Sequence, residues 1–229
     1  NQTSGVSGGT VSTTATGGSV FGTGAVTVNG GVIGLVGGTS AQAITIPTLN
    51  YGGGSYLQLS GSVSTSTLTA TALNRNNLGT LTLLVSDLAN FGTLGTGSLR
   101  VTTGSVLTVA NGMLATPNIF VRLAGAAQDA TFASLTGSTL ILNTATTVGT
   151  LSASGSASLA DLATPVAVAT GSVDVLAVRT AADITPTDAT SLLRINTGGL
   201  IFNGATAPNL GANVYFGTLG VPREALVYV

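Results

Sequence analysis

Short apolar stretches alternate with turn residues along the whole chain. Apolar side chains recur at every second position in segments such as AVTV at 25–28 and TLTATAL at 67–73. A period of two in segments rich in Val, Ile and Thr predicts β-strands with one buried face. Further strands are expected at 43–46, 56–59, 80–85, 98–101, 106–109, 119–123, 139–142, 173–178, 192–195, 200–202, 213–216 and 225–229. We therefore expect an all-β protein built from many short strands.

Turn signals rich in glycine and asparagine separate these strands. They are NGG at 29–31, GGG at 52–54, NG at 111–112, TGG at 197–199 and NG at 203–204. Asn and Gly accept positive φ angles at low cost, so they suit tight turns. An NG pair can close a hairpin, and it can equally form the corner of a solenoid coil. Many short strands at fairly even intervals fit a sandwich, a barrel or a solenoid.

Internal repetition favours the solenoid. Residues 22–36 read GTGAVTVNGGVIGLV, and residues 95–109 read GTGSLRVTTGSVLTV. We interpret this phrase as one strand–corner–strand unit that the chain uses repeatedly, because repeated sequence is the mark of stacked architectures. A single repeat length is not evident. With roughly 20–25 residues per coil, the chain would form about nine to eleven coils.

The two ends of the chain suggest how it associates. We expect a single elongated β-solenoid domain over residues 21–229. Residues 1–20 are rich in Ser, Thr and Gly, which indicates either a flexible arm or a strand donated to a neighbour. Residues 225–229, ALVYV, form an apolar strand whose edge can pair with another chain. These features predict a homo-polymer that forms through the N-terminal arm and the C-terminal strand edge.

Composition narrows the classes of partner. Charged residues make up 6% of the 229 residues, the net charge is −1, and Arg75 is the first charged residue. The 38 Thr and 33 Gly imply a surface solvated by hydroxyl groups, with little charge repulsion to oppose self-association. A basic stripe is missing, so we expect no nucleic-acid partner. The apolar runs are also far shorter than a transmembrane segment of about 20 residues.

The residue types exclude most catalytic chemistry. The sequence has no Lys, His, Cys or Trp, which excludes disulfides, thiolate metal sites and a Ser–His–Asp triad. Asp183 and Asp188 form the closest group of acids, in AADITPTDAT. We interpret them as turn or capping residues; the alternatives are an acid–base pair and a single calcium site. We therefore expect no enzyme activity, no catalytic, metal-binding or cofactor-binding residues, and no cofactor.

Threonine pairs offer a different kind of surface. Thr65, Thr67, Thr69 and Thr71 alternate along one expected strand, and similar pairs recur at 80/82, 144/146 and 185/187. A flat face that orders water needs such pairs in register, once per coil. Their separations along the chain are irregular, so we interpret them as β-formers that solvate the surface.

Several segments resemble one known family. GTGAVTVNGGVIGLVGG at 22–38, LNRNNLGTLTLLV at 73–85, GTGSLRVTTGSVLTV at 95–109 and the stretch 175–229 resemble the autotransporter-associated β-strand repeat proteins. In the last stretch the order R-T-x-x-D-I-T-P, S-L-L-R-I, G-G-L and E-A-L-V-Y-V follows the habit of that family. The resemblance implies a right-handed parallel β-helix on the exterior of a bacterial cell. It implies surface display or adhesion and supplies no catalytic residues.

Two functions follow as expectations. The first is an extracellular structural protein, a subunit or segment of a bacterial cell-surface fibre that self-associates end to end. The second is the passenger domain of an adhesin that binds glycan or another cell surface through Thr, Ser and Asn side chains.

Overall fold

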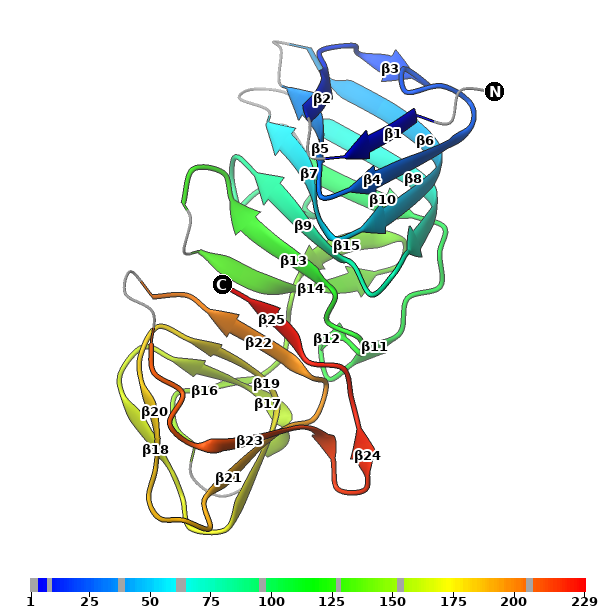
Figure 1. The fold of residues 1–229 in the computed structure, drawn as a ribbon. Coiled ribbons are helices and arrows are strands. Elements are labelled where there is room, and N and C mark those ends of the chain that lie inside the picture. The colour runs from blue at the N-terminus through cyan, green and yellow to red at the C-terminus, as the bar shows by residue number, and fades with distance from the viewer. Residues whose placement is uncertain are drawn as a thin grey trace. The chain divides into compact units, whose positions relative to one another are not determined.

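A computed structural model describes residues 4–7, 10–36, 40–60, 65–94, 98–126, 129–151, 155–204 and 208–229. These residues form β-strands and turns, and none of them forms a helix, let alone one able to cross a membrane. The prediction of an all-β protein is therefore confirmed (Figure 1).

Contacts divide the chain into two compact units, where we expected one body over 21–229. Unit 1 comprises Asn1–Leu107, Asn118–Ala127 and Phe132–Leu142. Unit 2 comprises Thr108–Pro117, Gln128–Thr131 and Asn143–Val229.

Unit 1 is one curled sheet of 13 strands that doubles back on itself (Figure 1). One series of neighbouring parallel strands is β1 (Ser4–Ser7), β4 (Ala25–Asn29), β6 (Gln42–Gly52), β8 (Ser66–Arg75) and β10 (Leu99–Thr103), with β3 (Gly17–Gly18) beside β6. The other series is β2 (Thr10–Thr13), β5 (Val32–Val36), β7 (Gly54–Ser60), β9 (Thr80–Val85) and β13 (Ile119–Leu123). The chain alternates between the two series.

The two series enclose an apolar interior whose residues stack in columns. Ile33, Leu57, Leu83 and Val121 pair in register on successive strands, and each is at most 1% exposed. Ile33 and Leu57 are 24 positions apart, but Leu83 and Val121 are 38 apart. Loops of different length therefore connect strands whose register is constant. This is why a single repeat length is missing from the sequence.

The corners between β4 and β5, β6 and β7, and β8 and β9 also stack. Gly30 and Gly53 have φ angles of 69° and 57°, and Asn77 and Leu78 take the same left-handed conformation at 47° and 57°. A Cβ atom on Gly79 would lie 2.4 Å from the Cα of Gly52, so glycine is required there for the layers to approach each other.

An antiparallel hairpin joins the two series at one end of unit 1. Its strands are β14 (Ala130–Thr136) and β15 (Thr139–Leu142), and β15 also pairs antiparallel with β10. In the order of the sheet, β14 lies next to β13, so the hairpin links the last strands of both series. The sheet is consequently mixed and not uniformly parallel.

The two copies of the repeated phrase fold differently. Residues 22–36 form the expected unit, with β4, a glycine corner and β5. In 95–109, residues 95–97 lie outside the described part, β10 follows, and the expected strand at 106–109 is absent apart from Val109 in the short strand β11. Gly104 has no positive φ to turn a corner, and the Ser105 hydroxyl instead contacts the backbone N and O of Leu73.

The N-terminal segment pairs within its own chain. Strands β1, β2 and β3 pair with β4, β5 and β6, while residues 1–3 and 8–9 lie outside the described part. Gln42, which is buried, also donates its side-chain amide to the carbonyl oxygen of Ala15 at 3.1 Å. Donation of this segment to a neighbouring molecule stays a prediction.

Unit 2 is built from shorter strands. Its main sheet contains β16 (Thr147–Val148), β17 (Gly155–Leu162), β19 (Ser172–Thr180), β21 (Leu192–Ile195), β22 (Gly199–Phe202), β23 (Asn213–Thr218), β24 (Val221–Pro222) and β25 (Leu226–Tyr228). Two further pairs are β18 (Val166–Val168) with β20 (Ile184–Pro186), and β11 (Val109–Ala110) with β12 (Met113–Leu114). The pairs β11–β12 and β23–β24 are antiparallel, and the other pairs of unit 2 are parallel.

The long strand β19 organises the core of unit 2. Its first half pairs with β21 and its second half with β22, since the turn at Asn196–Gly198 separates those two strands. Val173, Val175 and Val178 from β19 pack with Leu193, Ile195 and Leu200 in one apolar cluster. Two ion pairs join strands that are neighbours in this sheet, Arg179 with Asp161 and Arg194 with Asp174.

Candidate functional site

The two aspartates singled out in the sequence make separate sets of hydrogen bonds. The Asp188 carboxylate accepts hydrogen bonds from the Thr170 hydroxyl at 2.7 Å and from the backbone N–H of Thr190 at 2.8 Å. The hydroxyls of Thr170 and Thr190 and the Thr190 N–H lower the pKa of Asp188 to about 2. The Asp183 carboxylate accepts the backbone N–H of Asn209 at 2.7 Å. Asp188 therefore acts in the turn-capping role that we expected, whereas Asp183 bonds a residue 26 positions away and does not cap a local turn.

The other acids do not assemble a metal site in the described part of the chain. Asp161 and Asp174 face Arg179 and Arg194 across adjacent strands. Within the described ranges, no group of three or more His, Cys, Asp or Glu side chains is close enough to hold a metal ion.

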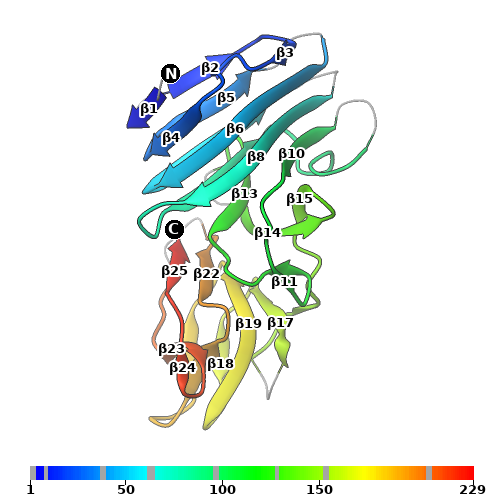
Figure 2. The same cartoon turned by 90° about the vertical axis from the view of Figure 1, so that its right-hand side faces the viewer.

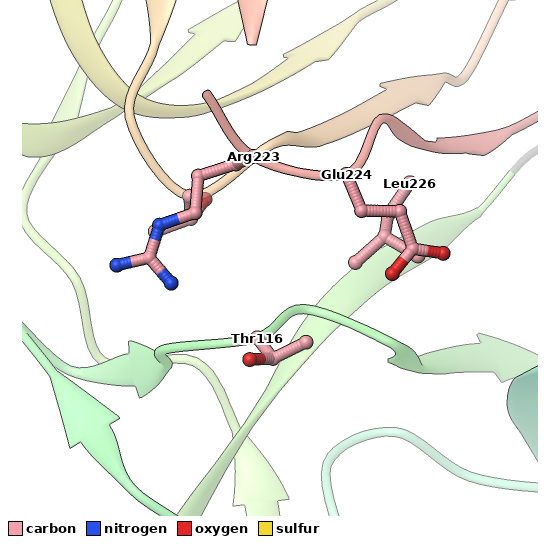
Figure 3. Close-up of a pocket in the computed structure, with 5 residues that line it drawn as sticks. Thr116, Arg223, Glu224 and Leu226 are labelled. Atoms are coloured by element: carbon pink, nitrogen blue, oxygen red, sulfur yellow. The ribbon is translucent and has the colours of Figure 1, made fainter. Parts of the chain in front are cut away.

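A small pocket lies in unit 2, near the end of the chain. Thr116, Thr197, Arg223, Glu224 and Leu226 line a cavity of about 160 Å³ (Figure 3). Figure 3 shows Arg223 and Glu224 pointing to opposite sides, with Thr116 facing them. The cavity offers one cation, one anion and one exposed hydroxyl, and we assign no ligand to it.

Two of the interior columns end in an exposed valine, one on β2 and one on β25, and we call these two surfaces the end layers. In unit 1, Val11 on β2 pairs in register with Ile33, yet Val11 is 43% exposed and Ile33 only 1%. In unit 2, Val227 on β25 continues the column of Val178 and Leu200 and is 45% exposed, against 0% and 2%. Each valine is exposed because no described strand stacks on its far side. The apolar interior therefore reaches solvent at β2 and at β25.

Val214 and Phe216 on β23 belong to the same end layer of unit 2. They pair in register with Leu193 and Ile195, which are fully buried, but are themselves only half-buried. They pack against the apolar cluster of the unit from its edge.

A row of threonines crosses the outer side of unit 1. Thr45, Thr69, Thr102, Thr139 and Thr136 occupy paired positions on the adjacent strands β6, β8, β10, β15 and β14. We call this row the threonine column. Figure 2 shows β6, β8 and β10 side by side. Of the threonines noted in the sequence, only Thr69 belongs to this column; the pairs at 80/82, 144/146 and 185/187 do not.

Sequence reasoning missed both the end layers and the threonine column. Thr69 was noticed as part of one strand, but its partners Thr45 and Thr102 lie on other strands, 24 and 33 positions away. Pairing register, which the sequence does not display, decides which side chains meet.

Comparisons with protein-family models, with curated proteins and with solved structures gave no match.

Proposed function

We propose that this chain is a structural protein, a segment of an extracellular β-solenoid fibre on a bacterial cell surface that self-associates end to end. Both units would be right-handed parallel β-solenoids. Parallel pairing of strands about one circuit apart, as in β4 with β6 and β19 with β21, supports this reading. Crossover connections between parallel strands are right-handed in nearly all known cases. The cell-surface location rests on the family resemblance.

The observation that best supports self-association is the pair of end layers. Val11 and Val227 each leave an apolar column open to solvent, and stacked folds need such ends to be covered. Strands β2 and β25 each pair in parallel with one neighbour and present an unpaired edge within the described part of the chain. Parallel edges of this kind can accept a further strand and continue the ladder.

The geometry favours a head-to-tail contact between copies. The end layer at β2 and the end layer at β25 are different surfaces, so a contact between them leaves one of each open at the ends of the assembly. Heterologous contacts of this kind propagate into filaments when the rotation does not close a ring. Low charge lowers the repulsion that opposes this contact, since the chain has 13 formally charged residues in 229.

Charge introduced into an end layer tests the proposal. Val11→Asp and Val227→Asp place a carboxylate on surfaces that are already about half exposed, so we expect the fold to persist. Each variant alone should lose the filaments that the wild-type chain forms in electron micrographs. When the two variants are mixed in equal amounts, they should form dimers but nothing longer. Each variant retains one intact end layer, so each molecule can make only one contact. Light scattering with size-exclusion chromatography distinguishes dimer from monomer.

Matched controls carry the same change away from the end layers. Val106→Asp in unit 1 and Leu219→Asp in unit 2 alter side chains that are 98% and 83% exposed. They should assemble like the wild type. A wild-type chain that stays monomeric at high concentration contradicts the proposal. Filaments that survive both Val11→Asp and Val227→Asp also contradict it. Loss of filaments after deletion of residues 1–20, with Val11→Asp harmless, would favour donation of that segment instead.

The second candidate function is adhesion through a glycan. The threonine column favours it, because it is an ordered array of hydroxyl groups on the outer side of unit 1. We propose no enzyme activity and no cofactor for the chain.

A further inference from the structure

The threonine column is more regular than strand preference requires. Thr45 pairs with Thr69, Thr69 with Thr102, Thr102 with Thr139, and Thr139 with Thr136, so five adjacent strands each contribute one threonine. Their in-strand neighbours Ile44, Leu68, Val101 and Leu140 are at most 1% exposed. Because side chains alternate between the two faces of a strand, the threonines point outward.

The neighbouring outward positions provide an internal comparison. Two positions toward the start of β6, β8 and β10, the outward residues are Ala43, Thr67 and Arg100, followed on β15 by Ile141. That row mixes four residue types, although it lies on the same strands. β-propensity alone favours Val, Ile and Thr at all such positions. Propensity therefore does not account for a row made of threonine alone.

The hydroxyl groups of the column are aligned but not saturated. The Thr102 hydroxyl donates to the Thr69 hydroxyl at 2.9 Å, and Arg100 donates from Nη2 to the Thr139 hydroxyl at 3.1 Å. Each hydroxyl offers one donor and two acceptor positions. Thr45, Thr69, Thr102 and Thr139 are half-buried and Thr136 is exposed, so a ligand can reach the row.

Spacing and charge define the ligand. Neighbouring strands lie about 4.8 Å apart, so the five hydroxyls span roughly 19 Å measured along the sheet. The row contains no charged residue, and Arg100 beside it already donates to Thr139. A polymer with hydroxyl groups at regular intervals and no charge matches such a row. We propose that the threonine column binds an extended neutral polysaccharide laid across the strands of unit 1.

This inference rests on the second candidate function and not on self-association, and the two can fail separately. Binding is therefore measured on the Val11→Asp/Val227→Asp variant, which is designed not to assemble. Depletion from solution by insoluble cellulose and by chitin gives the affinity for two neutral polymers. Alginate serves as the anionic comparison.

Replacement of threonine by valine removes the hydroxyl and keeps the shape and the strand preference. The triple variant Thr69→Val/Thr102→Val/Thr139→Val should bind at least about tenfold more weakly, since several hydrogen bonds are lost. The single change Thr102→Val should give a smaller loss of the same sign. The matched control Thr147→Val/Thr185→Val/Thr218→Val alters three exposed strand threonines of unit 2 and should bind normally.

Three results would overturn the inference. One is the absence of binding to both neutral polymers. Another is equal binding by the column variant and the control. The third is preferential binding of alginate, which would assign recognition to Arg100 and not to the hydroxyls. Circular dichroism and thermal melting establish that each variant is folded.

Discussion

At the scale of single residues, the interior of unit 1 contains one tyrosine whose ionisation the fold opposes. Tyr51 is 2% exposed and belongs to the interior column below Val28. Burial raises the pKa of Tyr51 to about 12, although Arg75 and the hydrogen bond from Asn118 act in the opposite direction. The Asn118 side-chain amide lies 3.1 Å from the Tyr51 hydroxyl.

This pKa predicts that the fold loses stability at alkaline pH. An unfolded tyrosine ionises near pH 10 and the folded one near pH 12. The folded state therefore holds its proton more tightly, and the free energy of unfolding should fall between pH 10 and 12 by about 2 to 3 kcal/mol. Denaturant titrations of Tyr51→Phe should show a flatter dependence over this range. Tyr56→Phe is the control and should keep the wild-type fall; an unchanged fall in Tyr51→Phe would contradict the assignment.

At the scale of elements, the sequence predicts strands rich in Leu, Ile and Val well and strands of small residues poorly. The segments 80–85, 119–123, 139–142 and 192–195 are strands at the expected bounds. By contrast, β17 was missed because GSASLADL has mostly small side chains, and its place comes from pairing with β19. Whether a turn is a corner or a hairpin was also open: Asn111–Gly112 closes the hairpin of β11 and β12, whereas Gly30 turns a corner.

The corner between β8 and β9 is strained in a way that can be relieved. Leu78 has a φ of 57° and is 71% exposed. The left-handed conformation destabilises the fold at a non-glycine residue, and the exposed leucine side chain makes little packing contact to offset this. Leu78→Gly should raise the free energy of unfolding by about 1 kcal/mol, because glycine takes this conformation freely.

Chemical denaturation of the variant gives the sign of this effect. Leu219→Gly is the control, since Leu219 is 83% exposed and its φ is not positive. It should lower stability slightly through the greater freedom of the unfolded chain. A loss of stability in Leu78→Gly would mean that the leucine side chain has a packing role in the corner.

At the scale of the whole molecule, charge is scarce and most of it is engaged. Arg179 and Arg194 form ion pairs, and Arg75 donates to the backbone carbonyls of Gly79 and Leu78. Among the six arginines, Arg223 is the exposed one. The composition alone shows that the chain carries few charges. Which arginines are paired and which is exposed follows only from the strand pairing.

This distribution predicts where a protease acts first. The chain has no lysine, so trypsin has six sites, and the folded protein should be cut first after Arg223 in the segment between β24 and β25. Mass spectrometry of a timed digest of the Val11→Asp/Val227→Asp variant, which is designed not to assemble, should show loss of residues 224–229 before any other cut. Arg223→Gln should survive intact over the same time. Early cleavage after Arg75 or Arg179 would contradict the hydrogen bonds of Arg75 and the ion pair of Arg179 described above.

The constant register of unit 1 has a consequence for how such a chain can change over generations. Ile33 and Leu57 are 24 positions apart and Leu83 and Val121 are 38 apart, yet both pairs are single steps of the same ladder. The height of the stack is counted in strands of about 4.8 Å, so inserted or deleted loop residues leave it unaltered. Insertions and deletions in the loops outside the stacked corners should therefore accumulate among descendants of this sequence. Gain or loss of one strand from each series is the change that alters the extent of the sheet.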